Sequence, residues 1–528
     1  MRRGLLLSGS CLAGYLAALD NTVVAVALRD VQSDLGAGVS GLQGVVTGYV
    51  VALAALLLTG GTLADLWGRR RVLMVGLAVF AGASAGCALA PGVAWLVAAR
   101  CVQGAGAALV VPASLAVLAA AYPDAGPRAR AIGLWAASGA LALVAGPVTG
   151  GLLVQLAGWR AVFWVNVPLC ALVAVLCAGR AGAGPAVPAG PADPAPDTAR
   201  RIDLRGQLAA AGALGAGTYA VVLAGRDGVA APVLGALAAA GVLAAVFVVA
   251  ERRAVRSGVE PVLPVGLLRD RAFGAALVAA FAASLAIFVL LVFMSLLFQL
   301  VEDDGPLAAA VRLLPLTAGA VVAAPLAAAW AAARGPRVPV TGGLLLCAGG
   351  LLGCAGALHG AAARLEVLLA VAGAGAGLTG APVVAAALAT VSRTREGLAG
   401  AAVSVGRELG GIVAVAGLGS LVVNRLAADL LSRLHVLGTT RGPAQLVVDL
   451  VLRGVTSDRE VLAATHGTVG LDALLALRSA ATASYLSSTR VALLAAAGIV
   501  GLAAVLAGAG LRGEVSGRSP RARVPPAG

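Results

Sequence analysis

The sequence predicts an all-α integral membrane protein that crosses the bilayer fourteen times. Its 528 residues are 60% hydrophobic and only 12% charged, with a mean hydropathy of +0.97. No soluble domain has enough interior to bury such a chain. Apolar runs of the ~20 residues that a helix needs to cross a bilayer recur along the sequence. The predicted spans lie at 5–28, 40–63, 72–89, 93–121, 131–155, 162–178, 207–224, 230–250, 273–298, 307–332, 338–358, 365–390, 402–423 and 490–510.

The arginines test this span count independently. The chain has no lysine, so all 38 basic residues are arginine, and short cytoplasmic loops are enriched in such residues. With the N-terminus inside, twenty-four arginines fall in the inner segments, whereas the short outer loops hold only Arg29, Arg160, Arg226 and Arg364. Both termini are therefore predicted to be cytoplasmic. The composition is typical of a GC-rich bacterial gene, so we expect the bacterial cell membrane.

Three segments do not read as spans. Residues 179–206 hold five prolines between Pro185 and Pro196, which predicts a cytoplasmic linker. Residues 511–528 form a short basic cytoplasmic tail. Residues 424–489 are predicted to be a long outer loop, with an amphipathic helix near its start. The chain then divides into a first membrane region at 1–178, two extra spans at 207–250, a cytoplasmic loop at 251–272 and a second membrane region at 273–510.

Two ionisable residues lie inside predicted spans. Asp20 is in the first span, and Arg100 is in the fourth, three residues before Gln103. A carboxylate in a span is costly unless it is paired, protonated or facing water, so Asp20 is a candidate for proton uptake and release. At ~1.5 Å per residue, the two charges lie at similar depths and can pair. The alternatives are an aspartate at the outer interface and a snorkelling arginine.

A short charged turn and a glycine-rich strip complete the motifs. The turn, 61–71, lies between the second and third spans and carries one carboxylate followed by three consecutive arginines. The strip, 139–151 in the fifth span, combines a proline with several glycines, which permits bending and close helix packing. Ordinary helix packing explains the strip almost as well.

Together these segments resemble the major facilitator superfamily, in particular its branch of fourteen-span drug:proton antiporters. The turn resembles the family's loop between spans two and three, with Gly61, Asp65, Gly68 and Arg69 in register. The other matches are Asp20 and Thr22 in the first span, Arg100, Gln103 and Gly104 in the fourth, Gly146, Pro147, Gly150 and Gly151 in the fifth, and Gly158-Trp159-Arg160 and Asn166-Val167-Pro168 at the sixth.

The resemblance implies two six-helix bundles with two inserted helices between them. It implies a proton-coupled antiporter that exports small amphiphilic drugs or antibiotics, works as a monomer, takes energy from the proton gradient and needs no cofactor. The roles it implies are proton coupling for Asp20 and Arg100, a substrate cavity at Asp20, Thr22 and Gln103, a gating loop at Gly61, Asp65, Gly68, Arg69 and Arg70, and an antiporter strip at Gly139, Gly146, Pro147, Gly150 and Gly151.

The sequence departs from the family pattern at four positions. Ala25, Arg29, Leu66 and Ala332 stand where the family usually has asparagine, proline, a basic residue and an acidic residue. Leu66 removes one charge from the gating loop. These differences affect the expected substrate range and coupling rather than the fold, and an importer or uniporter of the same fold is the alternative function.

Other classes of protein are disfavoured. The basic residues lie between apolar runs instead of on one face, which argues against a nucleic-acid binder. A chain without lysine cannot supply the phosphate-binding loop of an ATP-driven pump. The three histidines are scattered, so an enzyme is not expected, and the seven cysteines lack metal-ligand spacing, so no metal site is predicted.

Overall fold

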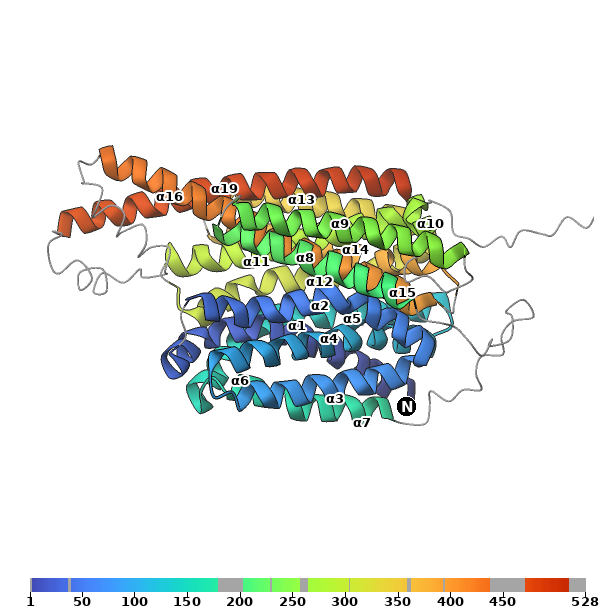
Figure 1. Ribbon diagram of the computed structural model, residues 1–528. Coiled ribbons are helices and arrows are strands. Elements are labelled where there is room, and N and C mark those ends of the chain that lie inside the picture. Colours follow the sequence, from blue (N-terminus) through green and yellow to red (C-terminus); the bar gives the residue numbers. More distant parts are fainter. Residues whose placement is uncertain are drawn as a thin grey trace, which may run out of the picture.

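A computed structural model describes residues 2–36, 39–178, 203–227, 230–256, 265–302, 304–358, 362–392, 395–436 and 471–511, and these residues form an all-helical bundle. Helices are the expected solution because a bilayer offers no water to satisfy exposed backbone groups. Figure 1 shows the long helices running roughly side by side. Residues 179–202 of the predicted linker, the middle of the outer loop and residues 512–528 of the tail lie outside the described residues, whereas the last residues of the predicted linker, from Leu204, belong to a helix.

The first half of the bundle contains α1 (Arg2–Leu35), α2 (Val39–Trp67), α3 (Arg69–Ala88), α4 (Val93–Ala121), α5 (Ala125–Ala157), α6 (Ala161–Trp164) and α7 (Asn166–Ala178). Helix α4 packs against α2 and α3, and α1 packs against α5 and α7. Glycines bring α2 and α4 close: a Cβ on Gly104 would lie 3.1 Å from the Cβ of Ala52. Small residues at such crossings allow the van der Waals packing that holds membrane helices together.

The second half contains α10 (Val265–Arg269), α11 (Arg271–Leu300), α12 (Pro306–Arg334), α13 (Arg337–Ala357), α14 (Ala362–Ala389), α15 (Glu396–Ile412), η3 (Val413–Leu418), α16 (Gly419–Val436) and α19 (Leu471–Gly510). Helix α14 packs against α11, α12 and α13, while α19 packs against α11 and α13. The inserted pair is α8 (Leu204–Asp227) and α9 (Ala231–Arg256). Helix α8 contacts α2 of the first half and η3 of the second.

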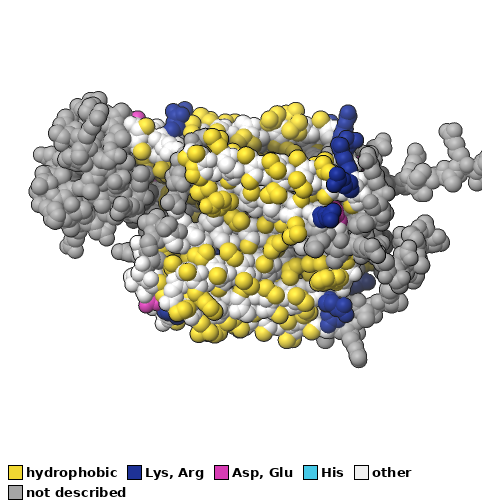
Figure 2. Space-filling view, viewed as in Figure 1, with side chains coloured by type: hydrophobic (Ala, Val, Ile, Leu, Met, Phe, Trp, Pro, Cys, Tyr) yellow, Lys and Arg dark blue, Asp and Glu magenta, His cyan; other side chains and the backbone are white. Residues whose placement is uncertain are grey.

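The surface of the bundle is apolar, as expected for a protein in lipid. Only 6% of the apolar stretch of α9 is buried inside the protein, and several of its leucine and valine side chains are exposed, namely Leu234, Leu237, Val242, Val246 and Val249. Arginines gather at the end of the bundle that holds the N-terminus (Figures 1 and 2). We call this the arginine-rich end; it includes Arg69–Arg71, Arg128, Arg252 and Arg337. The opposite end is called the far end.

The fold class is confirmed, but the span count is not. Among the described residues, twelve helices are long and apolar enough to cross a membrane, and thirteen if α1, which bends by 40° after Val24, is counted once. The remaining predicted span, 131–155, lies inside the 33-residue helix α5, of which Val148–Ala157 forms a shorter apolar stretch.

The predicted outer loop at 424–489 has helical flanks, which corrects its boundaries. Helix α16 reaches Val436, and α19 starts at Leu471, well before the predicted start of the last span at 490. The two helices pack together and project from the far end (Figure 1). The expected amphipathic helix is present as α16. The hydropathy of these residues predicts a loop because their charges lower the local average. Two helices can nevertheless pack together when only one face of each is apolar.

Candidate functional site

Asp20 and Arg100 form an ion pair in the interior of the first half. Asp20 is 0% exposed and Arg100 is 1% exposed. Asp20 lies on α1 just before its bend, and Arg100 lies on α4, so two helices that are distant in sequence supply the two charges. A buried pair of this kind avoids the larger cost of a lone charge in a low-dielectric interior. The predicted pairing is present.

Amide side chains complete the hydrogen bonding of this pair. Gln103 Nε2 donates to Asp20 Oδ1 at 2.8 Å, and Asn166 Nδ2 donates to the same oxygen at 2.7 Å. Both amides also donate to Ser84 Oγ, at 2.6 and 3.1 Å. Gln103 lies one turn after Arg100 on α4 and accepts from its Nη1 at 2.7 Å. We call Asp20, Arg100, Gln103, Asn166 and Ser84 the buried network.

Tyr49 fixes the guanidinium in place. Its ring lies 4.2 Å from Arg100 Cζ, in cation–π geometry, and its hydroxyl donates to Ala17 O at 3.0 Å. Arg100 Nε donates to Val45 O at 3.1 Å. Sequence reasoning missed the roles of Tyr49, Ser84 and Asn166. The resemblance marked Asn166 without a role, and a polar residue at the start of an apolar helix was the available signal.

The charged turn brings the two halves together at the arginine-rich end. Asp65, near the end of α2, accepts hydrogen bonds from the backbone N–H groups of Gly397 at 2.9 Å and Leu398 at 2.8 Å. These groups belong to the first turn of α15, whose N-terminus carries partial positive charge. Gly61, one turn earlier, permits the approach, because a Cβ there would lie 2.6 Å from Gly397 O.

Glu396, the first residue of α15, adds two ion pairs to the contact between the halves. Arg69 Nη1 lies 3.1 Å from Glu396 Oε2, and Arg128 Nη2 lies 2.7 Å from Glu396 Oε1. Gly68 immediately precedes α3 and has a φ of 96°, a conformation that side-chain-bearing residues rarely adopt. Arg70 instead donates to Ala178 O of its own half. We call the contacts of Asp65, Arg69 and Arg128 with 396–398 the closing contact. Sequence reasoning missed Glu396 and Arg128, which lie far from the motif.

The glycine strip packs α5 against α1. A Cβ on Gly146 would lie 2.7 Å from Thr22 Cβ, and a Cβ on Gly150 would lie 3.0 Å from Val23 O. A Cβ built on Gly139 or Gly151 would point into open space. The helix continues through Pro147. Thr22 itself donates to Leu19 O at 3.1 Å and packs at this contact, outside the buried network.

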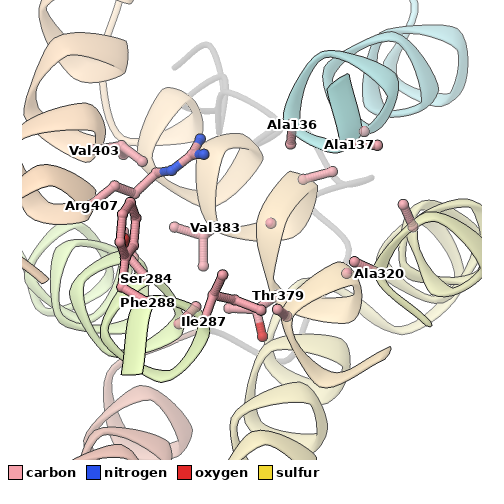
Figure 3. Close-up of a pocket in the computed structure, with 18 residues that line it drawn as sticks. Ala136, Ala137, Ser284, Ile287, Phe288, Ala320, Thr379, Val383, Val403 and Arg407 are labelled. Atoms are coloured by element: carbon pink, nitrogen blue, oxygen red, sulfur yellow. The ribbon is translucent and has the colours of Figure 1, made fainter. Parts of the chain in front are cut away.

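A cavity of about 120 Å³ lies between the halves, lined by residues of α5, α11, α12, α14 and α15. Figure 3 shows Ala136 and Ala137 on one side, Phe288 and Ile287 on another, and Arg407 reaching in from α15. Asp20, Thr22 and Gln103 are not among the residues that line it in this conformation. Arg407 was missed by sequence reasoning, although it lies in the predicted span 402–423 and an ionisable residue there is a signal for function.

No group of three histidine, cysteine or acidic side chains suited to a metal ion occurs among the described residues. Two helical halves that meet at one end of a membrane-spanning bundle, with a cavity between them and a buried ion pair inside the first half, are typical of a membrane transporter. A family profile described as Major Facilitator Superfamily matches residues 10–415, and the chain belongs to this family. Its members carry small molecules across membranes.

Curated relatives match over most of the chain. "Multidrug resistance protein Stp" of Mycobacterium tuberculosis is 35% identical over 417 residues, which are 79% of this chain and 75% of that protein. "Methylenomycin A resistance protein" of Bacillus subtilis is 34% identical over 414 residues, which are 78% of this chain and 85% of that protein. The solved structure of the proton:xylose symporter XylE shares the fold, with a TM-score of 0.56 and 14% identity over 95% of this chain and 94% of that one.

Proposed function

We propose that this protein is a proton-coupled antiporter that exports small amphiphilic compounds across a bacterial cell membrane. The observation that carries the proposal is the fully buried Asp20–Arg100 pair, whose carboxylate is the natural place to hold a transported proton. The names of the relatives, a multidrug resistance protein and an antibiotic resistance protein, support export as the direction. The alternative, an importer or uniporter, lacks this support.

The orientation follows from the charge distribution. Short loops rich in arginine face the cytoplasm, so the arginine-rich end is the cytoplasmic end and both termini lie inside. The closing contact then seals the cytoplasmic side in this conformation. Opening it requires Asp65 and Glu396 to release their partners, which exchanges access from one side of the membrane to the other.

Protonation is proposed to drive this exchange. When Asp20 takes a proton from outside, its attraction to Arg100 falls, and the donors that hold the carboxylate in α1 weaken their bonds. A proton that moves inward through ~150 mV releases ~3.5 kcal/mol, enough to sustain a substrate gradient of about a few hundredfold. No cofactor and no ATP take part, no nucleic acid is bound, and the monomer is the working unit. The protein is not an enzyme.

The proposal is tested with the purified chain in vesicles that hold a dye and an imposed pH gradient. Wild type should move dye only when the gradient is present. Asp20→Asn should abolish the gradient-dependent part while the protein remains folded in the membrane. The matched control is Asp34→Asn, on the same helix, whose carboxylate is 47% exposed and pairs with Arg160 at the far end. Proton-coupled transport that survives in Asp20→Asn would contradict the proposal.

A further inference from the structure

We propose that Arg407 is the substrate-recognition subsite of this transporter, and that it selects compounds carrying an anionic or strongly hydrogen-bond-accepting group. The inference rests on the proposed function only in taking the cavity as the place where the transported compound binds. It concerns the chemistry of that compound, which neither the buried network nor the closing contact specifies.

Arg407 is the one charged side chain among the eighteen residues that line the cavity in the described part of the chain. Hydroxyl groups of Ser284 and Thr379 are the other polar side chains there, and Thr379 Oγ1 already donates to Gly375 O at 2.9 Å. The rest of the wall is alanine, glycine, valine, isoleucine and one phenylalanine, Phe288. An apolar pocket with one oriented charged group is the usual form of a small-molecule site.

The guanidinium of Arg407 has its donors available. Over the described residues, the structure gives it neither an ion pair nor a hydrogen bond, and its one cation–π contact there is with Trp135 of α5, whose ring centre lies 5.6 Å from Cζ. A cation–π contact leaves the planar N–H groups without acceptors. Figure 3 shows the guanidinium extending from α15 into the space beside α5. A ligand acceptor can therefore approach it from the cavity.

Arg100 shows what an arginine with internal partners looks like in the same protein. Its N–H groups are taken by Asp20, by Gln103 and by the backbone oxygen of Val45. The contrast indicates that Arg407 is held ready for a partner outside the chain. A bidentate bond to a carboxylate or a similar oxygen pair is the interaction that guanidinium geometry favours most.

The acidic groups nearby do not supply that partner. Glu408 interacts electrostatically with Arg407, but it is the next residue on α15, about 100° around the helix axis, and does not line the cavity. Asp20 is buried and fully engaged in the first half. A cationic compound in the cavity would meet a positive charge and no facing carboxylate, so the site favours anions.

A matched pair of small ligands tests the inference directly. The full-length protein in detergent is titrated by calorimetry with 1-naphthoate and with 1-naphthylmethylammonium, which share a ring system and differ in charge. Wild type should bind the naphthoate more tightly. Arg407→Gln should weaken naphthoate binding about tenfold or more, since a charge-assisted hydrogen bond is lost, and should leave the ammonium compound unaffected or tighter. Arg407→Lys should retain part of the affinity, and Arg252→Gln, at an exposed arginine of α9, should match wild type.

Equal naphthoate binding by wild type and Arg407→Gln, preference of wild type for the ammonium compound, or no binding of either ligand would overturn the inference. The wild-type preference needs no variant, so the test holds even if Arg407→Gln does not fold. The vesicle assay with Asp20→Asn separates the two proposals. Arg407-dependent naphthoate binding together with transport that ignores the pH gradient would reject the antiport mechanism alone, whereas gradient-driven transport with no effect of Arg407→Gln on naphthoate binding would reject the subsite alone.

Discussion

Replacing Asp65 with asparagine should open the arginine-rich end of the bundle. The carboxylate accepts two backbone hydrogen bonds, from Gly397 and Leu398, at the positive end of α15. Asparagine keeps one acceptor oxygen and loses the charge. A charge-assisted hydrogen bond is worth about 1.5–3 kcal/mol, and a negative charge at a helix N-terminus adds about 0.3–1 kcal/mol. A net loss of about 2 kcal/mol would shift the ratio of closed to open protein about thirtyfold.

Pulsed electron resonance between two spin labels measures this shift in lipid nanodiscs. Exposed positions Arg71 on α3 and Val338 on α13 put one label on each half at the arginine-rich end, with the exposed Cys101 replaced by serine. Wild type should give a short, narrow distance distribution. Asp65→Asn should add a longer component, because the two ion pairs of Glu396 remain but no longer suffice.

The control is Asp124→Asn at the same end of the molecule. Asp124 is an exposed carboxylate at the start of α5 and makes no capping hydrogen bond with its side chain. Its replacement removes the same charge without touching the closing contact, so its distance distribution should match wild type. If Asp65→Asn also matched wild type, the two backbone hydrogen bonds would not hold the halves together and the reasoning would fail.

Two further predictions concern the first half. Gly146→Val should lower the thermal unfolding temperature and the transport rate, because its side chain would meet Thr22 and overpacking costs about 1–3 kcal/mol. The control Gly151→Val places its side chain in open space and should melt as wild type does in scanning fluorimetry. Equal melting temperatures of the two variants would disprove the packing argument. Asn166→Leu removes the 2.7 Å donor to Asp20 but leaves Arg100 and Gln103 in place, so the rate of gradient-driven efflux should fall about tenfold instead of vanishing, and an unchanged rate would make the amide a bystander.

The sequence was sufficient for the helical membrane fold, and it marked Asp20 and Arg100 as charges that can pair. Both follow from local rules. Apolar runs must be helical in lipid, and a charge inside a span is costly unless an opposite charge at the same depth pairs with it. The same rule applies to Arg407, which stands in an apolar run and was nevertheless overlooked because no motif surrounds it. The beginning of α19 was misplaced because hydropathy averages over charges that a projecting helix pair can tolerate.

The closing contact could not be predicted from the sequence. Asp65 and its two backbone donors are more than three hundred residues apart, and the donors are main-chain groups that every residue carries. These two N–H groups can donate to Asp65 only because α2 packs against α15. Glu396 is likewise an ordinary acidic residue at a helix start until Arg69 and Arg128 converge on it. Such roles depend on how the two halves meet, which local patterns do not encode.

The complete burial of Asp20 bears on how the protein affects the proton-motive force of the cell while it is not transporting. Asp20 has no exposed surface, and both of its carboxylate oxygens accept hydrogen bonds from side chains, so the carboxylate is closed to solvent in this conformation. If Asp20 carries the transported proton, as we propose, this conformation gives that proton no direct route to either side of the membrane. Exchange of that proton then requires α1 and α4 to move apart, so a copy at rest in this conformation is expected to leave the proton-motive force intact.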